Sequence, residues 1–88
     1  MMDEETLLEF PCAFPIKMMG RDTPEFHATV RELVERHTGP LEDTAFQAAQ
    51  SREGRFVSIT VTVTAESKAQ LDAIYEDLTA HEDVLMAL

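Results

Sequence analysis

The amino-acid sequence predicts an α+β fold in which two helices cover one face of a four-stranded antiparallel sheet. Along residues 57–64, valine and isoleucine alternate with serine and threonine. Successive side chains of a strand point to opposite faces, so this strand has one apolar face and one hydroxyl-bearing face. Along residues 71–78, large apolar residues recur at helical spacing and form one stripe. A half-polar strand followed by an amphipathic helix indicates a sheet that is covered on one side only.

Composition limits the number of domains and the class of partner. The 88 residues, 44% of them hydrophobic, are enough for one small domain. Seven Lys and Arg against seventeen Asp and Glu give a net charge of -10, which argues against binding to nucleic acid or to an anionic membrane surface. The sequence has neither the basic, apolar start of a signal peptide nor a run long enough to span a membrane, so we expect a cytoplasmic protein.

The N-terminal residues differ from the rest of the chain. Residues 1–5 are too polar to pack, and Pro11 and Pro15 limit regular structure by removing backbone donors. We therefore expect a mobile tail and an apolar lead-in segment over residues 1–13, followed by a single domain over residues 14–88.

The domain is expected to begin with a strand over residues 14–19 and a helix after it. Thr23 is a favourable N-cap and Pro24 a favourable first helical residue. Gly39, followed by proline, is typical of a helix end. The predicted apolar stripe of this helix consists of Phe26, Val30, Leu33, Val34 and His37.

The second half is expected to contain two strands, a helix and a last strand. A weak strand over residues 44–50 and the strong alternating strand are joined by a turn over residues 51–54, which predicts a β-hairpin. Ser67 and Gln70 form a candidate capping box for the second helix. Residues 81–88 are expected to form the last strand, with Val84, Met86 and Leu88 on one face.

The element order β-α-β-β-α-β predicts the ferredoxin-like fold. With two right-handed crossovers it gives a sheet of spatial order 4-1-3-2 with both helices on one face. The predicted core consists of Phe14, Ile16, Met18, Phe26, Val30, Leu33, Val34, Phe46, Val57, Ile59, Val61, Leu71, Ile74, Leu78, Val84 and Met86.

The residue types that usually carry catalysis or bind metals are scattered. His27 and His37 are ten residues apart on one predicted helix, about 15 Å along its axis, so they cannot share an ion. His81 has no neighbours at zinc-like spacing, and no basic residue adjoins Cys12 to stabilise a thiolate. We therefore predict a protein without catalytic residues, a metal site or a cofactor.

Two surfaces remain as candidate sites. The loop Gly20, Arg21, Asp22 and Thr23 precedes a helix N-terminus, which attracts anions, and is a candidate ligand site. The uncovered sheet face mixes hydroxyl groups with apolar groups and is a candidate protein-contact surface, although such a face is also stable when simply solvated. Its expected members are Lys17, Met19, Phe56, Ser58, Thr60, Thr62, Leu85 and Ala87.

Residues 7–88 resemble the YbeD-like family of small bacterial proteins of unknown function. The resemblance rests on four segments in the same order and with similar spacing: LLEFPCAFPIKMMG, VRELVERHTGP, GRFVSITVTVTAESKAQLDAIYEDL and VLMAL. It implies a ferredoxin-like domain similar to the amino-acid-binding regulatory (ACT) domains. Some family members are labelled as lipoate-related regulators, which implies a link to lipoate metabolism. Asp22-Thr23-Pro24 is similar to the start of the ACT ligand loop, with Glu25 in the place of its glycine.

The sequence therefore favours a non-enzymatic regulatory or adaptor domain. We expect it to bind a protein partner through the open sheet face or an edge strand, and to pair with itself through such an edge. The alternative is a sensor of an amino acid or related metabolite, similar to ACT domains.

Overall fold

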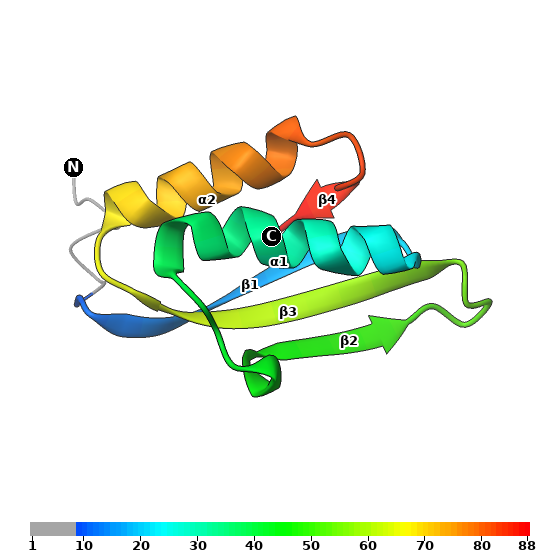
Figure 1. Cartoon of the computed structure of the whole chain (residues 1–88), viewed down its shortest axis with the longest axis horizontal. Coiled ribbons are helices and arrows are strands. Elements are labelled where there is room, and N and C mark those ends of the chain that lie inside the picture. Colours follow the sequence, from blue (N-terminus) through cyan, green and yellow to red (C-terminus); the bar gives the residue numbers. More distant parts are fainter. Residues whose placement is uncertain (1–8) are drawn as a thin grey trace, which may run out of the picture.

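The computed structural model describes residues 9–88, so residues 1–8 of the predicted tail and lead-in segment over residues 1–13 lie outside the described part. The elements are β1 (Cys12–Arg21), α1 (Pro24–Thr38), a short 3-10 helix (Asp43–Ala45), β2 (Phe46–Gln50), β3 (Phe56–Ala65), α2 (Lys68–Ala80) and β4 (Met86–Ala87). Figure 1 shows both helices on the same face of the sheet.

The sheet confirms the predicted topology. Its strands are ordered β2-β3-β1-β4, which is the order 4-1-3-2 of the ferredoxin-like fold. β1 and β3 form the long central antiparallel pair, from Cys12 opposite Ala65 to Arg21 opposite Phe56. β2 and β4 are the edge strands, and both pair antiparallel with their single neighbour.

α1 begins and ends where the sequence predicts. The Thr23 side chain accepts a hydrogen bond from the Phe26 N–H at 3.0 Å, and Pro24 occupies the first turn. At the other end, the Gly39 N–H donates to the Glu35 carbonyl, with Gly39 at a φ of 79°. Four of the five predicted stripe residues are buried: Phe26, Val30, Leu33 and Val34.

β1 is longer than predicted and runs through Pro15. Lys17 exchanges two backbone hydrogen bonds with Leu88, and the Met19 carbonyl accepts one from the Leu85 N–H. The odd-numbered backbone groups of β1 therefore point toward β4. β4 is only two residues long and does not reach Pro15. The missing proline N–H therefore removes no hydrogen bond from the sheet.

The capping box predicted for α2 forms only in part. The Ser67 side chain accepts a hydrogen bond from the Gln70 N–H, as expected. The Gln70 side-chain oxygen accepts from the Glu66 N–H rather than from Ser67, and its amide group donates to the His37 carbonyl. Gln70 thus joins the start of α2 to the end of α1.

The prediction for the last strand assigns Met86 and Ala87 to the wrong faces of the sheet. Met18, which is fully buried, lies opposite Ala87, while Met19 lies opposite Met86. Ala87 therefore faces the helices, and Met86, which is 50% exposed, faces the open side. The alternating pattern fails because the segment before β4 is not extended: the Val84 N–H donates to the His81 carbonyl in a turn.

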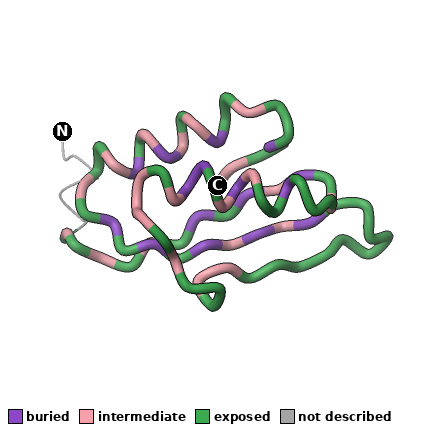
Figure 2. The backbone as a smooth tube through the Cα atoms, in the orientation of Figure 1, coloured by how far each residue is buried: buried purple, intermediate pink, exposed green. Residues whose placement is uncertain are grey.

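The core lies between the sheet and the two helices, as the buried positions in Figure 2 show. Of the predicted core, only Met86 is exposed, while Phe14 and Phe46 are partly buried and pack against the other members. Val63 and Ala65, which the prediction left out, are fully buried. No helix in residues 9–88 is long and apolar enough to cross a membrane.

Candidate functional site

A small pocket of about 150 Å³ lies beside the N-terminus of α1, next to the predicted ligand loop. Its walls come from the end of β1, the first turn of α1 and the loop between α2 and β4. The lining residues are Arg21, Thr23, Phe26, Glu82, Asp83 and Leu85. The lining thus combines one arginine and two acidic residues with the apolar residues Phe26 and Leu85.

Three of the four predicted ligand residues have structural roles. Gly20 is buried beneath the Phe26 ring and leaves no room for a side chain. The Thr23 hydroxyl caps α1. Asp22 Oδ1 lies 2.9 Å from His27 Nε2, and its other oxygen accepts a hydrogen bond from the Gln50 side chain. These two hydrogen bonds, from His27 first and Gln50 second, lower the pKa of Asp22 below its ordinary value.

The open face of the sheet carries six of the eight residues predicted for protein contact. In the β1–β3 register, Met19 is opposite Ser58 and Lys17 is opposite Thr60, and this side is not covered by a helix. Leu85 and Ala87 are the exceptions, since Leu85 lines the pocket beside α1 and Ala87 faces the helices. The other six, all on this face, are Lys17, Met19, Phe56, Ser58, Thr60 and Thr62.

One end of this face is apolar. Met86 lies beside Met19, and reciprocal backbone hydrogen bonds place Leu88 beside Lys17. The residues Phe56, Met86 and Leu88 are 36%, 50% and 61% exposed. We call Met19, Phe56, Met86 and Leu88, together with Lys17 and Arg21, the open-face patch.

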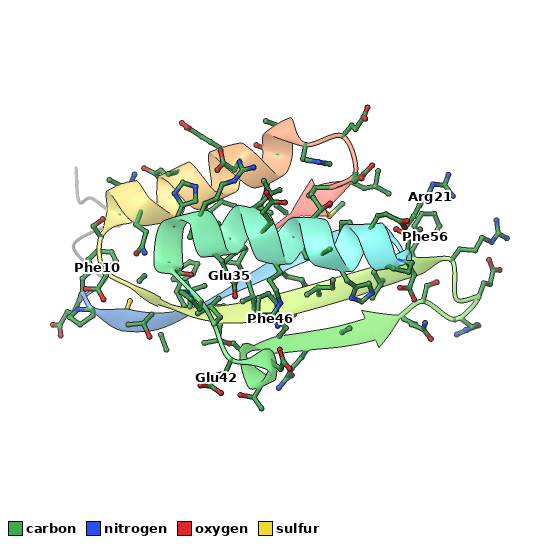
Figure 3. All side chains as sticks on the ribbon, viewed as in Figure 1. Phe10, Arg21, Glu35, Glu42, Phe46 and Phe56 are labelled. Atoms are coloured by element: carbon green, nitrogen blue, oxygen red, sulfur yellow. The ribbon has the colours of Figure 1, made fainter. Side chains whose placement is uncertain are left out.

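The charge of the sheet differs from that of the whole molecule. None of the four strands contains an aspartate or a glutamate, although the chain has seventeen. Their two charged residues are Lys17 and Arg21, both in the open-face patch. The Arg21 guanidinium lies 5.5 Å from the centre of the Phe56 ring, at the end of the sheet where both are labelled in Figure 3. The charged side chains of the patch are therefore both cationic, on a strongly acidic protein.

A second exposed feature is the edge strand β2. The sequence predicted the strand but not its exposure from Gln47 to Gln50. Ala48 lies opposite buried Ile59 and faces the helix side, but it is exposed because neither helix extends over β2. A hollow of about 210 Å³ separates β2 from α1, with Val30 and Ile59 in its lining. The sequence signal was the lack of large apolar residues after Phe46, which leaves β2 with little to bury.

The histidines and Cys12 have separate surroundings. His27 pairs with Asp22, His37 Nε2 lies 2.6 Å from Asp77 Oδ2, and the His81 ring accepts a hydrogen bond from the Asp83 N–H. Cys12 is partly buried against the core. Within residues 9–88, no group of three or more His, Cys, Asp or Glu side chains is placed to hold a metal ion.

Comparison with known proteins identifies relatives over nearly the whole chain. A family model described as a protein of unknown function (DUF493) matches residues 5–88. A UPF0250 protein of Chromobacterium violaceum is 47% identical, with 98% of this chain and 97% of the relative covered. A UPF0250 protein of Nitrosomonas europaea is 40% identical, with 99% and 100% covered.

One solved structure has the same architecture. The solution structure of protein HP0495 from H. pylori matches with a TM-score of 0.72, covering 92% of this chain and 85% of that one. At 18% sequence identity, this likeness shows the shared fold and nothing about function.

Proposed function

Since the chain belongs to the DUF493 family of proteins of unknown function, we propose that it is a non-enzymatic regulatory or adaptor domain that binds another protein. The open-face patch is the proposed contact surface. The partner surface would carry carboxylates opposite Lys17 and Arg21 and apolar groups opposite Met19 and Met86.

The observation that carries this proposal is the absence of acidic side chains from the strands of a chain with a net charge of -10. If the acidic residues served only solubility, carboxylates would be expected on this face as well as on the rest of the surface. A cluster of exposed apolar side chains beside two cations instead suits a complementary acidic surface. Charge complementarity of this kind speeds association and rejects basic partners.

The test is affinity capture from cell extract followed by identification of the bound proteins. Phe56→Glu combined with Thr60→Glu places two negative charges on the open face and should abolish capture of the specific partner. Glu76→Lys, on the exposed side of α2, is the control that should leave capture unchanged. If the double variant folds and captures the same proteins as the wild type, the open face is not the contact surface.

The second candidate is a small-molecule sensor, and the pocket beside α1 is the observation that favours it. An amino acid could present its carboxylate to Arg21 and its ammonium group to Glu82 and Asp83. A ligand that binds the folded state raises the melting temperature by mass action. A panel of amino acids and related metabolites, including lipoate, should then contain a compound that stabilises the wild type but not Asp83→Ala. A panel without any shift argues against the sensor.

A further inference from the structure

The edge strand β2 presents unused backbone groups to its outer side. The Ser51 N–H donates to the Phe56 carbonyl, and the antiparallel alternation therefore turns the backbone groups of Gln47 and Ala49 toward β3. Those of Phe46, Ala48 and Gln50 point outward. The Phe46 N–H bonds to the Asp43 carbonyl, which leaves the Phe46 carbonyl and both groups of Ala48 and Gln50 available.

Nothing in β2 protects this edge. Proteins usually guard edge strands with charged side chains, prolines, bulges or covering elements. β2 has the sequence FQAAQ, pairs with β3 without a bulge, and is exposed from Gln47 to Gln50. The hollow between β2 and α1 leaves its helix side open as well. The other edge strand, β4, is only two residues long and offers a much shorter template.

Charges at the two ends of β2 have opposite signs. The loop before β2 carries Glu42 and an Asp43 that pairs with Arg31, and the hairpin turn after it carries Arg52 and the Arg55–Glu53 ion pair. Figure 3 places Glu42 near the start of β2, whereas Arg21 and Phe56 mark the opposite end. An antiparallel pairing of two such strands brings the acidic loop of each beside the basic turn of the other. A parallel pairing would oppose like charges.

We propose that β2 pairs antiparallel with β2 of a second copy of this chain, with the two Ala48 residues opposite each other. Each Ala48 N–H donates to the Ala48 carbonyl of the other copy. Each Gln50 N–H donates to the Phe46 carbonyl of the other copy, which gives four hydrogen bonds from groups that are free in one chain. The small alanine side chains allow the close approach, and the two sheets join into one of eight strands.

This inference does not depend on the proposed function, because the open-face patch consists of side chains on the open face of β1, β3 and β4, whereas the proposed pairing uses the outer backbone groups of β2. The Phe56→Glu and Thr60→Glu variant should still self-associate. A variant blocked at β2 should still capture a partner through the patch. The two proposals can therefore fail separately.

The first test uses one position with two substitutions. Ala48→Pro removes the outward N–H without removing a bond to β3, since proline is tolerated at such edge positions. Ala48→Val keeps the N–H and favours a strand. In sedimentation equilibrium the wild type and Ala48→Val should approach twice the 9.9 kDa chain mass as concentration rises. Ala48→Pro should associate roughly tenfold or more weakly. A wild type that stays monomeric at every concentration overturns the proposal.

The second test reads the individual amides by hydrogen exchange. Gln47 and Ala49 donate to β3 and should be protected at all concentrations. Ala48 and Gln50 should exchange quickly in dilute solution and become protected as concentration rises. If association protects other amides and leaves Ala48 and Gln50 unchanged, the contact lies elsewhere.

The third test uses charge reversal at two exposed residues, Glu42 and Arg52. Glu42→Lys alone and Arg52→Glu alone should each weaken self-association, because each opposes like charges at both ends of the pair. Mixing the two variants restores opposite charges at both ends and should recover association. Equal association of the single variants and their mixture would rule out the antiparallel arrangement.

Discussion

The ring of Phe26 lies so close to Gly20 that a Cβ added to Gly20 would be 2.5 Å from Phe26 Cε1. It would also lie 2.6 Å from the Asp83 carbonyl oxygen. Gly20 therefore allows the end of β1, the first turns of α1 and the loop before β4 to meet, and this meeting forms the pocket wall.

Gly20→Ala should destabilise the fold by about 1–3 kcal/mol through overpacking. For a domain of this size, that corresponds to roughly 4–8 °C in melting temperature per kcal/mol. Urea unfolding and thermal scans can measure both quantities. In a Phe26→Leu background the cost should shrink, because the nearest contact is with the ring. Wild-type stability of Gly20→Ala would contradict the close packing.

Asp22 should make the folded protein less stable as the pH falls below the ordinary pKa of an aspartate. Its pKa is lowered in the folded protein from the ordinary value of 3.8, by the hydrogen bonds from His27 and Gln50. The stabilisation is therefore present above that value and is lost as pH falls through the lower, folded pKa. Asp22→Asn should reduce this loss, and His27→Ala should raise the Asp22 pKa, both measured by NMR titration and thermal scans. An Asp22 that titrates at its ordinary value in the wild type would refute this account.

Arg31 should stabilise the loop between α1 and β2. Its guanidinium donates to Glu35, to Asp43 at 2.7 Å and to the Leu41 carbonyl, and it lies 4.3 Å from the centre of the Phe46 ring. Arg31→Lys loses this planar arrangement and should cost about 1 kcal/mol in urea unfolding. Arg36→Lys is the control, because Arg36 makes one exposed pair with Glu32 and should change stability by less than about 0.5 kcal/mol. Equal effects of the two variants would show that the loop contacts add nothing.

The facing of β4 can be tested with two adjacent residues. Ala87 faces the core beside Met18, so Ala87→Glu should bury a charge and cost about 2 kcal/mol or more. Met86 faces solvent, so Met86→Glu should change stability by less than about 0.5 kcal/mol. Thermal scans of the two variants give the comparison. The opposite order would support the facing predicted from the sequence.

Local patterns were enough to predict the elements and most of the core. Thr23, Pro24 and Gly39 define α1 because caps and helix ends depend on backbone chemistry within a few residues. The period-two alternation of β3 fixes its buried face, since a strand cannot change that relation without a bulge. Together with the handedness of crossovers, these patterns led to the strand order that the structure confirms.

Where the strands end and which of their residues stay exposed depended on tertiary contacts. Pro15 lies within β1 because β4 ends before reaching it, and Met86 faces outward because a turn at His81–Val84 shifts the last strand by one residue. The exposure of β2 depends on where the two helices lie. The contact between Gly20, Phe26 and Asp83 likewise depends on segments that are distant in sequence. Side-chain spacing along the chain determines which face a strand buries, whereas only the packed neighbours determine where the strand stops and what remains uncovered.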